Sequence, residues 1–274
     1  DRDLPSDTYY FRQVVGDPEH VLPVLTIHGN VVIHTQYVFC ARIVGVFDGS
    51  RPPSITIYAG QTVFVDPSAS SSAPEDQVID IGHWVEADLS APSDRTSTSG
   101  KAFSGGNFKF YTMAFGSLGV DVDASGGDGY GGAAGGKGGS VKAFASTGHL
   151  TIESCVSGGD GGDADPGKKG GDGGVGGTIL AQGATLYSLG HLTVSGGWGG
   201  NGGNGTEESV NGLDGGGGGA AGVIRAKAVV ETLFYDTDYQ ASGGNGGAGG
   251  HAGTGGKGGN GGPGGKQGIV EVDG

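Results

Sequence analysis

Glycine recurs with a strict period of three over long stretches in the second half of this chain. Counted from Gly243, the first position of each triplet is Gly up to Gly264, with Ala252 as the one interruption, and the second position of every one of these triplets is Gly as well. The blocks from Gly126 to Gly138 and from Gly158 to Gly176 keep the same phase. A disordered glycine linker needs no phase, so the period predicts a regular structure with three residues per turn.

The structure that fits this period is the extended left-handed helix of polyproline II and of each collagen strand, which rises about 3.1 Å per residue. Collagen is excluded because Gly fills two positions of each triplet here and the chain has only 10 Pro. Such a helix has no internal hydrogen bonds, so its backbone must pair with neighbours. Two Gly per turn allow that close approach, and the third position is expected to point outward, as at Asp160, Trp198 and Asn245.

The glycine blocks belong to a larger repeat. Four blocks open with Ser-Gly-Gly at Ser125, Ser157, Ser195 and Ser242, and each ends in a short apolar run. We therefore expect a unit of strand, glycine block and strand, with each block folded into two antiparallel arms around a tip. The strands are the expected scaffold, because glycine costs roughly 0.5–1 kcal/mol more to order in a regular element than alanine.

Composition changes near residue 117. Residues 1–116 hold 10 of the 65 Gly and many short β-branched runs with alternation, whereas residues 117–274 hold the other 55 Gly. Short alternating runs are typical of strands that bury one face. The prediction is an all-β chain: a β-solenoid-like stack of short strands, Gly-poor over 1–116 and Gly-rich over 117–274, with four polyglycine II blocks packed in a bundle.

At the glycine blocks the sequence resembles two groups of polyglycine II proteins, the snow flea antifreeze proteins and the receptor-binding adhesins at the tips of T-even-like phage tail fibres. It is also similar to secreted proteins in which Ser-Gly-Gly runs interrupt the strands of a β-solenoid. The resemblance covers residues 126–140, 158–178, 196–222 and 243–268. It implies a local conformation rather than a function, and the Gly-poor region of 1–116 departs from the antifreeze proteins.

Several classes of function are disfavoured by the sequence. The net charge of −14 argues against a nucleic acid partner, and no apolar run approaches the roughly 18 residues of a membrane span. No nucleophile elbow, phosphate loop or paired Cys motif is present. We expect no enzymatic activity, no metal and no cofactor. His149 and His191 begin two matching runs, which predicts a structural row of histidines.

Secretion is expected from three features. The chain starts at Asp1 without an initiator Met, as after removal of a signal peptide or at a cloning boundary. Asn204 begins a glycosylation sequon. Cys40 and Cys155 are the two cysteines, and they are read either as buried thiols or as a disulfide that would close a long loop.

The leading functional hypothesis is an extracellular structural protein that forms a filament, coat or matrix through strand edges. The expected assembly strands contain Ile269, Val270 and Val272 at one end and Tyr9, Tyr10 and Phe11, within the run 9–15, at the other. The alternative is an adhesin or glycan-binding module that contacts a cell-surface ligand through loop tips bearing Tyr130, Trp198 and His251. Ice binding ranks below both hypotheses. It requires a flat face of small residues, and the charged and bulky residues at the third positions make the face of the arms uneven.

Overall fold

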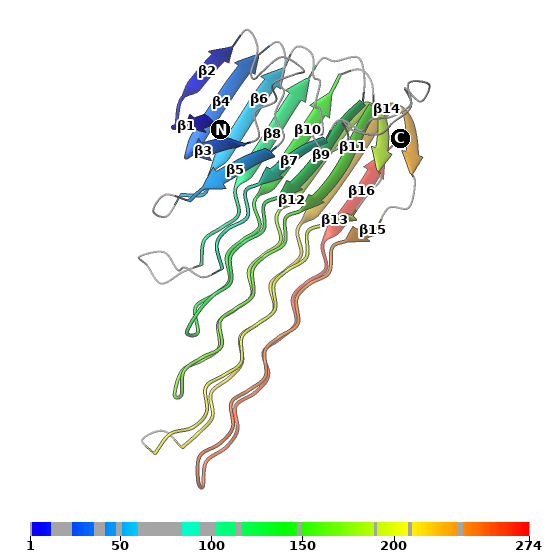
Figure 1. The fold of residues 1–274 in the computed structure, drawn as a ribbon. Coiled ribbons are helices and arrows are strands. Elements are labelled where there is room, and N and C mark those ends of the chain that lie inside the picture. Colours follow the sequence, from blue (N-terminus) through cyan, green and yellow to red (C-terminus); the bar gives the residue numbers. More distant parts are fainter. Residues whose placement is uncertain are drawn as a thin grey trace, which may run out of the picture.

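The computed structural model of the 274-residue chain describes residues 2–11, 24–35, 42–47, 51–59, 84–93, 102–112, 117–146, 149–188, 191–207, 210–234 and 238–273. Within these ranges the chain is all-β and contains no helix. Every strand pairing is parallel. The sixteen strands form two ladders of eight, one made of even-numbered and one of odd-numbered strands (Figure 1).

Ladder A contains the even-numbered strands. They are β2 (Thr8–Phe11), β4 (Asn30–Thr35), β6 (Ser54–Ala59), β8 (Asn107–Thr112), β10 (Ser140–Ala145), β12 (Thr178–Ser188), β14 (Val223–Phe234) and β16 (Ile269–Asp273). Ladder B contains the odd-numbered strands. They are β1 (Arg2–Leu4), β3 (Leu25–His28), β5 (Arg42–Val46), β7 (Trp84–Asp88), β9 (Ser117–Asp123), β11 (His149–Cys155), β13 (His191–Thr193) and β15 (Asp238–Gln240).

The hydrophobic core lies between the two ladders. Alternate side chains of each strand point inward, as the β-branched runs predict, and the ladder registers align them in columns. One column of ladder A consists of Val31, Ile55, Phe108, Val141, Ile179, Ile224 and Val270. The next consists of Tyr9, Ile33, Ile57, Phe110, Ala143, Ala181, Ala226 and Val272. Both columns contain side chains from before and after residue 117, so the Gly-poor and Gly-rich regions share one core.

The two ladders join near the C-terminal end of the stack. The strand β12 has a register irregularity between Gly183 and Thr185, after which it is no longer paired with β10, stays paired with β14 and also pairs with the start of β11. This pairing corrects the expected histidine row: His149 lies beside Thr185, whereas His191 lies beside Asp238 of β15. The long β12 occupies the place next to His149 that a matching His191 would need.

Arms connect β7, β9, β11, β13 and β15 of ladder B to the following strands of ladder A, and the last four arms are rich in glycine. Arm 2 (124–139), arm 3 (156–177), arm 4 (194–222) and arm 5 (241–268) contain 16, 22, 29 and 28 residues. Arm 1 spans 89–106, and its described parts are 89–93 and 102–106. Figure 1 shows arms 2 to 5 as hairpins that project from the same end of the ladders and lie side by side, reaching further from green to red. Each has the expected two antiparallel legs and a tip.

Candidate functional site: the glycine arms and the open end of the stack

The first two positions of each Gly-Gly-x triplet hold the arms together through backbone hydrogen bonds. The N–H of the first Gly donates to a carbonyl in the same leg of the next arm, as from Gly161 to Trp198 at 2.7 Å. The outgoing legs of the arms form one layer and the returning legs form the other. The N–H of the second Gly donates to a leg of the opposite layer, as from Gly197 in the outgoing leg of arm 4 to Gly174 in the returning leg of arm 3 at 2.9 Å. Each interior leg is therefore bonded both along its layer and across to the other layer.

The third position supplies a contact that sequence reasoning missed. Its N–H points away from both layers, and in many triplets it donates to an Asp or Asn side chain of the preceding arm. Trp198 N–H donates to Asp160 Oδ1 at 2.7 Å, and Ala248 N–H donates to Asn201 Oδ1 at 3.0 Å. Six more such bonds have the acceptors Asp128, Asp163, Asn204, Asp172, Asn211 and Asp214. We call these eight side chains the rung caps.

The rung caps explain why Asp and Asn are frequent at the third position. The sequence indicated only that these side chains would point outward and keep the arms soluble. Their recurrence at the same phase in neighbouring arms was the available signal, because short carboxylate and amide side chains readily accept hydrogen bonds from nearby backbone N–H groups.

Asn201→Ala should destabilise the chain by about 1 kcal/mol, because it leaves the Ala248 N–H without its protein acceptor at an exposed site. Amide exchange at Ala248 should accelerate, and urea unfolding should report the lost stability. Lys257→Ala is the matched control, since Lys257 is another exposed third-position residue and its side chain makes no hydrogen bond with the described residues. Equal effects of the two changes would contradict the proposed role of the rung caps.

The C-terminal end of the stack, formed by β15, β16 and arm 5, leaves core side chains uncovered. Val270 belongs to the column in which Ile179 and Ile224 are fully buried, yet it is 42% exposed because no further strand of the described residues covers it. Its neighbour Ile269 is 48% exposed. Among the described strands β16 pairs with β14 alone, so its other edge is unpaired within this part of the chain. This end combines an unpaired backbone edge with exposed apolar surface.

The N-terminal end is better covered. Leu4 of β1 is 3% exposed, and Tyr9 of β2 packs against the core while its hydroxyl donates to the Pro5 carbonyl at 2.9 Å. The strand β2 is paired in parallel with β4, so Tyr9, Tyr10 and Phe11 form an edge strand of ladder A, and their role in assembly stays a prediction. Residues 12–15 of that expected segment lie outside the described residues.

A row of stacked rings crosses the outer face of ladder A. Tyr10, His34, Tyr58, Tyr111 and Phe144 occupy one register column on neighbouring strands. Their ring centroids are 4.9, 4.8, 5.0 and 5.2 Å apart in order, and their planes are within 11° of parallel. This row was not predicted from the sequence. We call it the aromatic row.

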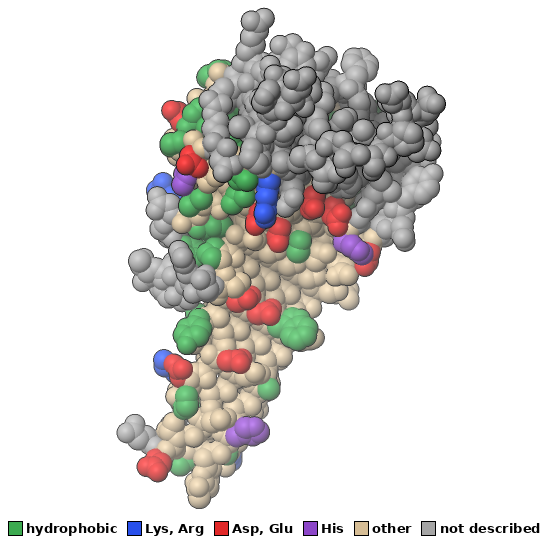
Figure 2. All heavy atoms as spheres, viewed as in Figure 1, with side chains coloured by type: hydrophobic (Ala, Val, Ile, Leu, Met, Phe, Trp, Pro, Cys, Tyr) green, Lys and Arg blue, Asp and Glu red, His purple; other side chains and the backbone are tan. Residues whose placement is uncertain are grey.

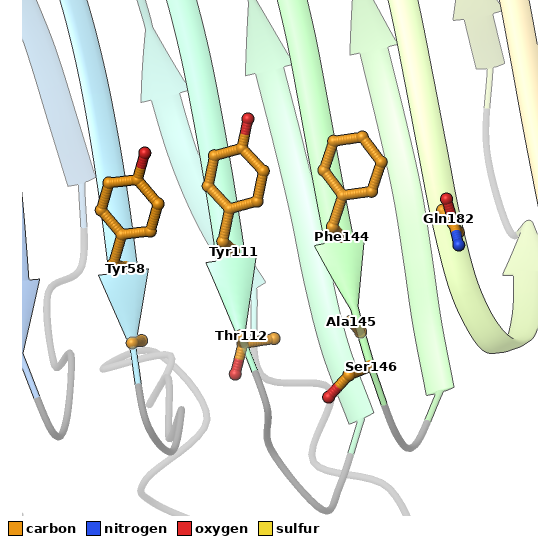
Figure 3. Close-up of a pocket in the computed structure, with 8 residues that line it drawn as sticks. Tyr58, Tyr111, Thr112, Phe144, Ala145, Ser146 and Gln182 are labelled. Carbon is orange, nitrogen blue, oxygen red and sulfur yellow. The ribbon is translucent and has the colours of Figure 1, made fainter.

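The aromatic row borders a groove of about 480 Å³ at the ends of β6, β8 and β10. In Figure 3 the rings of Tyr58, Tyr111 and Phe144 project side by side from neighbouring strands, and Gln182 continues the series. Because the ring faces lie against one another, the groove presents ring edges and the two phenol groups. Face-on stacking of a sugar or a base is therefore not available along the middle of the row.

The three residues expected at arm tips are exposed but do not share one location. Tyr130 is 83% exposed at the tip of arm 2, and His251 lies just before the tip of arm 5. Trp198, which is 60% exposed, was misplaced: it is the third residue of the first triplet of arm 4 and lies near the strands. Figure 2 shows separate hydrophobic and acidic side chains on this face of the arms rather than one apolar patch.

The structure describes the surroundings of two of the three residues that were expected to form a disulfide or to carry a glycan. Cys155 at the end of β11 forms no disulfide with a described residue, and its Sγ lies 3.3 Å from Ser125 Oγ and 3.6 Å from Ser157 Oγ. Cys40 lies outside the described residues, so the disulfide between Cys40 and Cys155 stays a prediction. Asn204 is exposed on arm 4, and its side-chain carbonyl accepts the His251 N–H at 2.9 Å. Its glycosylation also stays a prediction.

Among the described residues there is no cluster of three or more His, Cys, Asp or Glu that suits a metal ion. The same part of the chain has no helix with the length and apolar character needed to cross a membrane. Comparison with protein-family models, with curated proteins and with solved structures finds no match. The arms, the open C-terminal end and the aromatic row are therefore the candidate functional features of the molecule.

Proposed function

We propose that the chain is a β-solenoid with polyglycine II arms, and that it works as an extracellular structural protein that assembles end to end into filaments. The observation that carries the proposal is the 42% exposure of Val270, a residue in a column that is otherwise buried along the stack. Open parallel edges with apolar side chains favour pairing with another chain. The net charge of −14 keeps single molecules soluble before they stack.

The N-terminal end of a second copy suits this edge. If β2 continues ladder A in the register that it already has on β4, its Tyr9 falls opposite Val272 and its Tyr10 opposite Asp273. The half-buried Tyr9 ring would then continue the inward column over Val272. Each interface would extend ladder A by parallel pairing and reduce the exposure of the core at the C-terminal end.

Val270→Lys tests this interface, because a lysine at the end of the core column places a charge where the next copy must pack. The unchanged protein should form filaments in negative-stain images and sediment as polymers at high concentration. The variant should stay monodisperse with unchanged thermal unfolding of the single molecule.

Val175→Lys is the matched control. Val175 is 39% exposed at a third position of arm 3, away from β15 and β16, so a lysine there should not affect assembly. The proposal fails if the unchanged protein stays monomeric at all concentrations, or if both variants still form filaments.

A second candidate function is ligand capture by a surface adhesin that reads glycans. Tyr130 and Trp198 favour it, because large aromatic side chains are exposed on the arms at 83% and 60%. Glycan-array binding that is lost on Tyr130→Ala or Trp198→Ala would support this function over assembly. The extracellular location is supported by the exposed sequon at Asn204 and is tested by analysis of native material for the attached glycan.

A further inference from the structure

The outer edge of arm 5 presents a row of backbone donors. In arms 2, 3 and 4 the first Gly of a triplet donates its N–H to the next arm, as Gly212 does to Lys257 and Gly196 to Ser242. The equivalent glycines of arm 5 have no acceptor among the described residues. They are Gly243, Gly246 and Gly249 on the outgoing leg, and Gly258, Gly261 and Gly264 on the returning leg.

The returning leg keeps glycine where neither space nor backbone conformation requires it. In arm 4, a Cβ at Gly212, Gly215 or Gly218 would lie 2.1, 2.2 or 2.0 Å from a carbonyl oxygen of arm 5. At the equivalent Gly258, Gly261 and Gly264 the nearest atom lies 3.5, 3.5 and 3.8 Å away, and none of these glycines has a positive φ. Within the single chain, alanine would fit at all three places and cost less to order.

Two side chains extend the same pattern. Asn245 and Asn260 occupy third positions of arm 5, in line with Trp198 and with the rung cap Asp214 of arm 4. Within the described part of the chain, the side chain of neither residue makes a hydrogen bond. Each is placed to accept the N–H of a following arm, as Asp160 and Asp214 do for the arms that follow them.

We propose that the outer edge of arm 5 binds a further Gly-Gly-x arm of another polypeptide, in the register in which arm 5 binds arm 4. The edge continues an interface that already recurs between successive arms of this chain. It offers the first-position N–H groups together with the carbonyls of Gly259, Gly262 and Gly265, which accept no N–H among the described residues. The partner must therefore offer matching carbonyls and N–H groups, and it must have glycine at two of three positions to come close enough. This inference goes beyond the end-to-end stacking of strands and does not depend on it.

A second copy of this chain does not supply that partner. The outer edge of arm 5 can meet the same edge of a second copy only through a two-fold rotation, and that rotation does not repeat the register in which arm 5 binds arm 4. At the N-terminal end, β1 and β2 are joined by residues 5–7 alone, so no arm is present there. End-to-end stacking therefore leaves the edge of arm 5 open, and the partner is a distinct Gly-Gly-x polypeptide.

The test uses a fluorescent synthetic peptide with the sequence of residues 241–268, closed into a hairpin by a disulfide between added terminal cysteines. Closure lowers the ordering cost that a free glycine-rich peptide would incur on binding. The peptide should bind the full chain saturably in anisotropy measurements, and the amides of the six edge glycines should gain protection from exchange. A peptide of the same composition with shuffled triplet phase should not bind.

Protein variants locate the contact. G258A/G261A/G264A should fold and melt like the unchanged chain but bind the hairpin about a hundredfold more weakly, because each new Cβ meets a carbonyl of the added arm. H251A/K257A/K266A, changed at three exposed third positions of the same arm, should bind normally.

Three outcomes would overturn the proposal: no binding of the hairpin, equal binding of the shuffled peptide, or unchanged binding by G258A/G261A/G264A. Dimerisation of the chain alone that this triple variant abolishes would also overturn it, because it would show that the edge pairs with itself. The Val270→Lys variant should still bind the hairpin, and the triple variant should still form filaments. Hairpin binding and filament formation are therefore separate measurements, so failure of this proposal can be distinguished from failure of end-to-end assembly.

Discussion

Gly197→Ala should destabilise the arms by about 3 kcal/mol, whereas Gly258→Ala should leave the chain equally stable or slightly more stable. A Cβ at Gly197 would lie 1.9 Å from the Gly159 carbonyl oxygen and 2.5 Å from its carbon. Overpacking of this kind costs roughly 1–3 kcal/mol, and we expect the upper end because the neighbour is hydrogen-bonded backbone. At Gly258 the nearest atom is 3.5 Å away, so alanine mainly restricts the unfolded chain and contributes about 0.4–1 kcal/mol.

The two variants are compared by urea unfolding and by amide exchange of arms 3, 4 and 5. Gly197→Ala should release protection in arm 4 and in the preceding arm 3, because the Gly197 carbonyl accepts from Gly219 of arm 4 and the displaced Gly159 carbonyl accepts from Gly174 of arm 3. Gly258→Ala should leave every protected amide unchanged. If the two substitutions proved equally harmful, glycine would be needed for its backbone freedom rather than for close approach, and the packing account of the arms would be wrong.

Much of the arrangement of the arms is already present in the sequence. The Ser-Gly-Gly openings are separated by 32, 38 and 47 residues. The cap bonds of the outgoing legs join residues with the same separations, from Asp128 to Asp160, from Asp160 to Trp198 and from Asn201 to Ala248. Because a three-residue period fixes which N–H faces which neighbour, the repeat spacing was sufficient to predict the register of one arm on the next.

The rung caps were not predicted, because a period shows only that a side chain points away from its own helix. Whether Asp160 reaches water or the backbone of the next arm depends on the distance between arms, which close glycine packing sets. The misplacement of Trp198 has a simpler cause. Its bulk among glycines suggested a loop tip, although its position directly after Ser195-Gly-Gly marks the start of the arm.

The aromatic row was not predictable for a different reason. Its members Tyr58 and Tyr111 are 53 positions apart in the sequence, and long segments of irregular length separate the strands of the Gly-poor region. Alternation identifies which side chains of a strand share a face but does not give the register between strands. The open C-terminal end, by contrast, was anticipated at Ile269, Val270 and Val272, because an apolar run follows the last glycine block.

Phe110→Ala should reduce the free energy of unfolding by about 4 kcal/mol, within the range of roughly 3–5 kcal/mol for removal of a buried Phe. Phe110 is fully buried in β8, between Ile57 of β6 and Ala143 of β10. The short Ala143 side chain cannot fill the space that the ring leaves, so little relaxation is expected. Calorimetry and urea unfolding measure the loss.

Phe144→Ala is the matched control, because it removes the same ring from the half-buried outer face of the neighbouring β10. Loss of its stacking on Tyr111 should cost about 1 kcal/mol. A cost as large as that of Phe110→Ala would show that the aromatic row, and not the core between the ladders, holds the strands together.

The position of Phe110 also predicts how the chain should unfold. In a stack in which each coil contacts only its neighbours, stability is approximately a sum of local terms and interfaces between neighbours. A cavity at β8 weakens the interfaces to β6 and β10 together, at the middle of ladder A. We therefore expect the single unfolding transition to split in Phe110→Ala, with amides of β4 and β6 exchanging separately from those of β12 and β14. Uniform loss of protection along both ladders would instead show that the arms and the core make the whole stack unfold as one cooperative unit.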